Sequence, residues 1–201
     1  MTADLERRLE AALRVRGKPS SDYDLNPDVI LPKARSLRGA SVLVPITNAA
    51  NPRVILTKRS SALKHHPGQV AFPGGKVEDS DNDEAAAAIR EAHEEIGLSP
   101  DLVTVLGSLP SHETVTGFRV TPVVGIVSEA FKPVPDPGEV AEAFTVPFGH
   151  RLTAENYSIQ SRRWRGQRRF FFTVPYGPYY IWGAPARILR ALADRMADDK
   201  D

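Results

Sequence analysis

The feature that most constrains this chain is a glycine-containing turn that leads into an alanine- and glutamate-rich segment, residues 68–98. Alanine and the straight-chain Glu and Arg residues favour a helix from about residue 82 onward. We expect Asp81 to cap the start of this helix, in the capping-box relation with Glu84, and Gly97 to end it. The segment therefore predicts a strand, a tight turn, an acidic loop and one helix.

This predicted helix carries two stripes. At about 100° per residue, apolar side chains share one face and carboxylates share a neighbouring arc. The apolar stripe is Ala85, Ala88, Ile89, Ala92 and Ile96, and the carboxylate stripe is Glu91, Glu94 and Glu95. An exposed helix face is the ordinary place for carboxylates, although neighbours of like charge repel one another. The alternative is a divalent cation, because Mg²⁺ prefers oxygen ligands. The presence of Gly74 and Gly75 just before the helix favours the interpretation as a cation site, because glycine lets the backbone approach a ligand closely.

The segment also resembles a known motif. Gly75 through Leu98 is similar to the Nudix box, and the matching residues are Gly75, Arg90, Glu91, Ala92, Glu94, Glu95, Gly97 and Leu98. It departs from that box in having Asp81 where an early Glu is usual, with one more residue than usual before Arg90. The resemblance implies a hydrolase of a nucleoside diphosphate linked to another group. It also implies Mg²⁺ or Mn²⁺ held by Glu91, Glu94, Glu95 and the carbonyl of Gly75, with Arg90 orienting a glutamate.

A second signature precedes the box. Leu56 to Ser60, Leu63-Lys64, Gly68 and Phe72 to Gly75 resemble the coenzyme A pyrophosphatase branch of the family, with Lys64 where Arg is common. The resemblance implies cleavage of coenzyme A or acyl-CoA to 3′,5′-ADP and the 4′-phosphopantetheine part. Arg59 and Lys64 are then the candidates for binding phosphates, and Gly74 and Gly75 for contacting the substrate. ADP-ribose or another nucleoside diphosphate derivative is the nearest rival substrate.

Two later loops supply candidates for a general base. The first loop contains His112 and Glu113. The second contains Glu139 and Glu142, and it resembles the place where Nudix enzymes often supply an extra Glu as ligand or base. We rank Glu139 above Glu142, and we expect the catalytic set to be Arg90, Glu91, Glu94 and Glu139.

The rest of the chain predicts strands before and after the central helix, with helices at both ends. Helical spacing predicts helices over residues 2–16 and 184–196, and apolar or β-branched runs predict strands over 40–46, 54–58, 102–109 and 120–127. We expect residues 1–38 to be a helix and an extended connector packed on a domain of residues 39–201. This order indicates an α/β domain, which the resemblance sharpens to an α/β/α sandwich around a mixed β-sheet.

An arginine-rich hairpin over residues 157–174 leaves a different class of function open. Arg162, Arg163, Arg165, Arg168 and Arg169 lie beside Trp164 and Phe170 to Phe172. This mixture suits single-stranded nucleic acid, and equally a hairpin with one buried and one solvated face. A non-catalytic RNA-binding Nudix-like module is thus the alternative, and the complete carboxylate set argues against it.

Composition narrows the remaining choices. A net charge of +1 gives no general basic surface for nucleic acid, and the longest apolar runs are too short to span a membrane. The chain has no cysteine and no recognisable targeting segment, so we expect a cytoplasmic protein with a small-molecule substrate. A homodimer is left open. Val77 after Gly75-Lys76 excludes a Walker A loop, and neither a Gly-x-Ser-x-Gly elbow nor a dinucleotide fingerprint is present.

Overall fold

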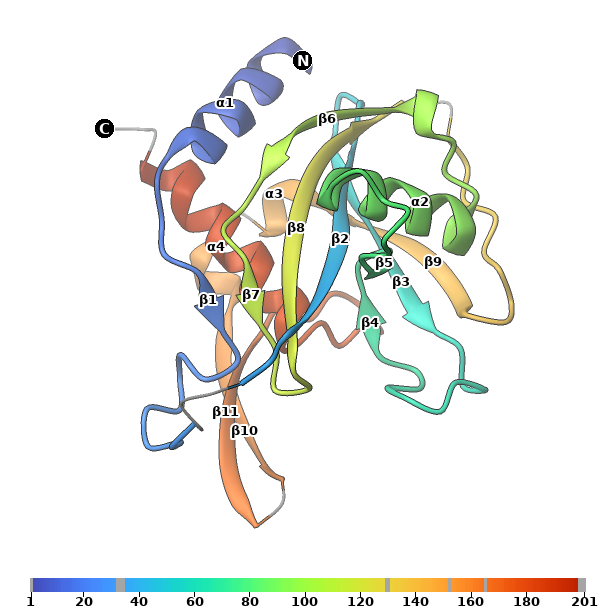
Figure 1. Cartoon of the computed structure of the whole chain (residues 1–201). Helices are drawn as coiled ribbons and strands as arrows, with labels where there is room; N and C mark the ends of the chain where they lie inside the picture. Colours follow the sequence, from blue (N-terminus) through green and yellow to red (C-terminus); the bar gives the residue numbers. More distant parts are fainter. Residues whose placement is uncertain (1, 32–34, 129–130, 152, 165, 199–201) are drawn as a thin grey trace.

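A computed structural model describes residues 2–31, 35–128, 131–151, 153–164 and 166–198. Within them, a mixed sheet of nine strands lies between helices (Figure 1). Its strands are β1 Ser20–Ser21, β2 Arg38–Thr47, β3 Arg53–Arg59, β4 Val70–Ala71, β5 Gly74–Lys76, β6 Val103–Ser108, β7 His112–Glu113, β8 Phe118–Val127 and β9 Val140–Pro147. The helices are α1 Thr2–Arg14, α2 Glu84–Ile96, α3 Phe148–Arg151 and α4 Ala184–Asp198, with 3-10 turns at Pro100–Leu102 and Ala154–Asn156.

The parallel pair β2 and β8 forms the centre of the sheet. The two strands stay in register from Arg38 opposite Phe118 to Thr47 opposite Val127, and the order across the sheet is β1-β7-β8-β2-β3-β4. Three further strands branch from it, with β5 on β2, β6 on β8 and β9 on β3, all antiparallel. The sheet is therefore mixed, as predicted.

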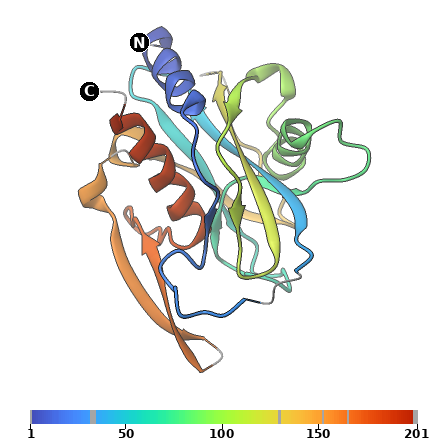
Figure 2. The same ribbon diagram turned by 60° about the vertical axis from the view of Figure 1, so that its left-hand side comes forward.

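Alternation along these strands fills two separate cores, because successive side chains point to opposite faces. Leu43 and Val123 pack with Ala88 and Ala92 of α2 on one face. Val44 and Val124 join a larger core on the other face, where α1 and α4 contribute Leu9, Leu189, Leu192 and Met196. Figure 2 shows the two helical layers on either side of the sheet, and the predicted α/β/α sandwich is confirmed.

The start of α2 corrects one prediction. Asp83, and not Asp81, is the N-cap, and its side chain accepts a hydrogen bond from the amide of Ala86 at 2.7 Å. Asp81 is unavailable because its carboxylate is held by Arg90 from the middle of the helix. Gly97 ends the helix in the left-handed region with φ 69°, as expected.

The N-terminal segment packs along the body of the domain. Leu9 and Ala12 of α1 are buried, and α1 contacts α4 and β6. The connector then adds β1 to the sheet by pairing with β7 in parallel. The division between residues 38 and 39 stays a prediction.

The arginine-rich hairpin forms as predicted and makes a sheet of its own. Strands β10 Ser158–Trp164 and β11 Gln167–Thr173 pair antiparallel and project away from the body (Figure 1). Asn26 of the connector is joined to the middle of β11, because its side chain exchanges two hydrogen bonds with the backbone of Phe170. Arg165 lies outside the described residues. None of the described helices is long and apolar enough to cross a membrane.

Candidate active site

The glycine turn and the carboxylate helix meet at the centre of the candidate site. Strand β5 pairs with β2, which places Gly74 opposite Val42, and α2 packs directly over it. A side chain at Gly74 would collide with the backbone of Ser41 and Val42. One at Gly75 would overlap the carboxylate of Glu91. Glycine is therefore required at position 74 for the close approach of two backbone segments, whereas the backbone of residue 75 lies against the carboxylate of Glu91, which would have to move to admit a side chain.

Glu95 is the most buried carboxylate of the site. Its residue is 4% exposed, and its Oε2 accepts one hydrogen bond from the amide of Gly74 at 3.2 Å. Burial raises the pKa of Glu95 to about 7, and the nearby negative charge of Glu91 adds to the shift. Burial also raises the pKa of Glu91. Two neighbouring carboxylates thus sit where negative charge is costly.

Arg90 gathers three of the acidic side chains. Its guanidinium binds both carboxylate oxygens of Asp81, at 2.9 and 3.0 Å, and donates to Glu91 at 3.1 Å and to Glu94 at 3.2 Å. It also donates to the carbonyl of Lys76, which ties the turn to the helix. The bond from Arg90 lowers the pKa of Asp81, and Asp81 and Glu91 in turn raise the pKa of Arg90. This geometry supports a positioning role for Arg90, and the fork to Asp81 is a contact that sequence reasoning missed.

The donor set fits a hard divalent cation. Asp81, Glu91 and Glu94 share the single guanidinium of Arg90, Glu95 accepts from the amide of Gly74, and the backbone of Gly75 lies beside the carboxylate of Glu91. Carboxylate and carbonyl oxygens are the ligands that Mg²⁺ and Mn²⁺ prefer. Among the described residues, no three acidic or histidine side chains already converge as a complete ligand set. Burial is the main reason that the pKa values of Glu91 and Glu95 are raised, and a cation at this place would favour the ionised form of both carboxylates.

Of the two candidate phosphate-binding residues, only Arg59 lies close to the carboxylates. Arg59 ends β3 and is half-buried, and its positive charge partly offsets the raised pKa of Glu95. Its Nε is buried without a hydrogen-bond partner in the described structure. Lys64 is exposed in the loop between β3 and β4. The structure thus brings Arg59 close to the carboxylates and leaves Lys64 on a solvated loop.

The two acids predicted to share a loop have different surroundings, because Glu139 precedes β9 and Glu142 lies within that strand opposite Lys58. Glu139 is exposed, and its negative charge contributes to the raised pKa of both Glu91 and Glu95, which places it near them. Its carbonyl accepts a hydrogen bond from the amide of Ser60, next to Arg59. Glu142 is hydrogen-bonded by the hydroxyl of Tyr179, whose ring stacks on Phe144. The ranking of Glu139 above Glu142 is consistent with this arrangement.

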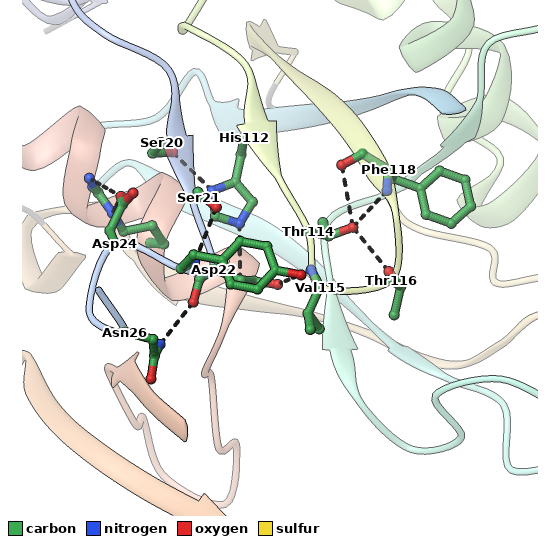
Figure 3. A network of polar contacts seen from close by, with 12 residues as sticks. Ser20, Ser21, Asp22, Asp24, Asn26, His112, Thr114, Val115, Thr116 and Phe118 are labelled. Carbon is green, nitrogen blue, oxygen red and sulfur yellow. Dashed lines mark hydrogen bonds and ion pairs between the residues drawn. The ribbon is translucent and has the colours of Figure 1, made fainter. Parts of the chain in front are cut away.

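His112 belongs to a different network, shown in Figure 3, and Glu113 follows it in β7. His112 is fully buried, with Nδ1 2.9 Å from Ser20 Oγ and Nε2 3.1 Å from Asp22 Oδ1. Glu113 forms an ion pair with Arg35. Both residues hold the connector to β7, and the structure does not support the proposal that either is a general base.

Comparisons with known proteins identify the family. The model of the NUDIX domain matches residues 37–164. The chain belongs to the Nudix family. It is 42% identical to an "Uncharacterized Nudix hydrolase NudL" from Enterobacter sp. (strain 638), over 78% of this chain and 81% of that protein. It is 39% identical to the protein of the same name from Klebsiella pneumoniae (strain 342), over 86% of this chain and 96% of that one.

The solved structures agree on the fold. A MutT protein from Methanosarcina mazei Go1 aligns over 85% of this chain and its own full length, with a TM-score of 0.52 and 17% identity. The domain match and the relatives, and not this structural likeness, show that the chain is a Nudix hydrolase, a class of enzymes that generally use divalent metal ions. Its Nudix box corresponds to β5, the acidic turn and α2.

Proposed function

We propose that this Nudix hydrolase cleaves the diphosphate of coenzyme A or an acyl derivative in a reaction that depends on Mg²⁺ or Mn²⁺. The products would be 3′,5′-ADP and the 4′-phosphopantetheine part. The observation that carries the chemistry is the packing of Glu91 and Glu95 against the glycine turn, where burial raises the pKa of both.

The metal, when bound, would neutralise diphosphate oxygens and lower the pKa of the attacking water. Glu91, Glu94 and Glu95 would hold it together with the carbonyl of Gly75. Arg90 would keep Glu91 and Glu94 in place, as its two hydrogen bonds to them suggest. Glu139 is our candidate for accepting a proton, because it is exposed yet close enough to influence the carboxylates of α2.

The choice of coenzyme A rests on the stretch before the box. The diphosphate and the separate 3′-phosphate of coenzyme A need more than one cationic group, and Arg59 at the end of β3 and Lys64 in the loop after it are the candidates. Arg59 suits this role because its charge already acts on Glu95 while its Nε lacks a partner in the described structure. Lys64 would add a mobile point charge from the loop.

A substrate panel tests the proposal. Coenzyme A, 3′-dephospho-coenzyme A, ADP-ribose, NADH and capped RNA are incubated with Mg²⁺ or Mn²⁺, and the products are separated by chromatography. We expect coenzyme A to have the highest kcat/KM. A higher value for ADP-ribose or another nucleoside diphosphate would overturn the substrate and keep the chemistry, whereas RNA retention with no turnover would favour the binding module.

Variants test the phosphate contacts separately. Arg59→Ala and Lys64→Ala should each lower kcat/KM for coenzyme A by about tenfold to a hundredfold, and less for the 3′-dephospho compound. His65→Ala is the matched control, because His65 is exposed in the same loop. Equal losses on both substrates would show that neither residue reads the 3′-phosphate.

A further inference from the structure

A basic pocket lies on the face of the sheet opposite α2. It has a volume of about 250 Å³ and opens between the end of α1, the first residues of the connector and α4. Arg16 and Lys18 line it from the connector, and Arg187, Asp194 and Arg195 from α4. Since α1 and α4 cover the larger core and α2 the smaller one, the pocket is separated from the candidate active site by the sheet (Figure 2).

Arg195 is the buried charge of this pocket. Its residue is 9% exposed, and Nη1 donates to the carbonyls of Ala12 and Val15 at the end of α1. Its guanidinium lies directly over the backbone of Gly17, where any side chain would overlap Nη2. The other guanidinium nitrogens make no hydrogen bond with the described residues. A buried cation with unused donors therefore borders the pocket.

The remaining charges leave a positive excess. The acid of the pocket, Asp194, is paired with Arg190 at 2.7 Å. Arg187 is paired with Asp24 at 2.9 Å. Arg16, Lys18 and Arg195 have no acidic partner among the residues that the structure describes. Exposed cations alone are usually just solvated, but here Arg16 and Lys18 line the same pocket as Arg195, which is buried.

These observations together indicate a small oxyanion as the ligand. Guanidinium groups bind phosphate oxygens through paired hydrogen bonds, and lysine adds charge without fixed geometry. The volume lies below the roughly 300 to 1,000 Å³ of sites that hold a whole drug-sized ligand. We propose that this pocket is a second anion site, which binds a phosphate or diphosphate group between the connector and α4.

Inorganic pyrophosphate is the probe for the test. The full chain is titrated in EDTA, so that no metal draws the anion to the carboxylates of α2, and amide shifts are followed by NMR. We expect saturable shifts around residues 16–18 and 187–195, together with a rise in Tm that follows the occupancy. Shifts centred on residues 59–66, or no saturable shift at all, would overturn the proposal.

A pair of matched variants completes the experiment. Arg16→Ala combined with Lys18→Ala should weaken pyrophosphate binding at least about tenfold and leave metal-dependent hydrolysis unchanged, because both side chains are exposed and lie outside the candidate active site. Arg7→Ala combined with Arg14→Ala removes the same charge from exposed positions of α1 outside the pocket and should retain the affinity. An equal loss of affinity in both double variants would mean that only the overall charge of the protein matters, which contradicts the proposal. Unchanged affinity in both would contradict it as well.

Discussion

Acidic side chains occur both in the cluster at α2 and in the connector network around His112. The two regions differ in whether each polar group has a partner of its own. At His112, each ring nitrogen has one partner, Ser20 or Asp22, so the polar groups of the network satisfy one another. At α2, Asp81, Glu91 and Glu94 share the single guanidinium of Arg90.

Glu95 extends this contrast, because it is buried with one amide donor for its carboxylate. The comparison teaches that a polar network whose groups all have partners stabilises the fold, whereas a cluster with an excess of negative charge indicates a candidate binding site for a cation.

The largest effect that would test this contrast is expected from Glu95→Gln. The substitution keeps the shape and removes the charge, so kcat/KM should fall by about a thousandfold, while the stability of the metal-free protein is unchanged or higher because a buried carboxylate is gone. Hydrolysis rates and urea unfolding in EDTA measure the two effects. Glu84→Gln, an exposed position on the same helix, is the control. Hydrolysis near the wild-type rate would remove Glu95 from the ligand set.

The opposite pattern is expected for His112→Ala. This change leaves a cavity and strips Ser20 and Asp22 of a partner, so the free energy of unfolding should fall by about 2 to 4 kcal/mol. The kcat of the protein that remains folded should be unchanged, because the histidine is fully buried in the connector network. Chemical unfolding and activity at low temperature measure both quantities, with His65→Ala as the exposed control. A large loss of kcat with normal stability would restore His112 as a candidate base.

The pH dependence of stability should also separate the two regions. Because burial raises the pKa of Glu95 from 4.5 to about 7, the folded metal-free protein retains a proton that the unfolded chain releases. The contribution of this proton to the free energy of unfolding is fully present below about pH 4.5 and is lost as the pH rises through 7. A separation of this size corresponds to about 3 kcal/mol at most.

Urea unfolding in EDTA at pH 5 and pH 8 measures this contribution. The wild-type protein should lose more stability between the two pH values than Glu95→Gln does, because other groups titrate equally in both. Parallel losses in the two proteins would mean that Glu95 is not the group responsible.

The sequence predicts much of the α2 region because its signals are local. The glycine turn, the end of the helix at Gly97 and the order of strands around them follow from residues that are neighbours in the chain. The choice between Asp81 and Asp83 as the cap does not follow, because both are acids at the right place and the decision depends on Arg90. The resemblance to the Nudix box supplied the candidate ligands, which still await a test.

The connector network and the basic pocket could not be predicted from local sequence signals, because both are formed by segments that are distant in the chain. His112 meets Ser20 and Asp22 from a distant part of the chain, and nothing near it in the sequence distinguishes a buried structural histidine from a base. Strand β9 was not predicted either, because it gains its partner β3 only through the folded sheet. The pocket likewise exists only where the end of α1 meets α4.

The smallest effect should come from Arg90→Lys, which keeps the charge and removes the fork. A lysine has a single ammonium group, so it cannot bind both oxygens of Asp81 while also donating to Glu91 and Glu94. Because these contacts position the carboxylates without touching the substrate, we expect kcat/KM to fall by about tenfold, or about 1.4 kcal/mol, and the metal concentration for half-maximal activity to rise. Asp81→Asn should give a similar loss, and the double variant should lose little more, since both changes break the same contact. Additive losses would mean that the two changes do not break the same contact. A fall in kcat with no change in metal dependence would mean that the Arg90–Asp81 pair does not act through the metal ligands, and that other residues hold the acidic side chains at α2 in place.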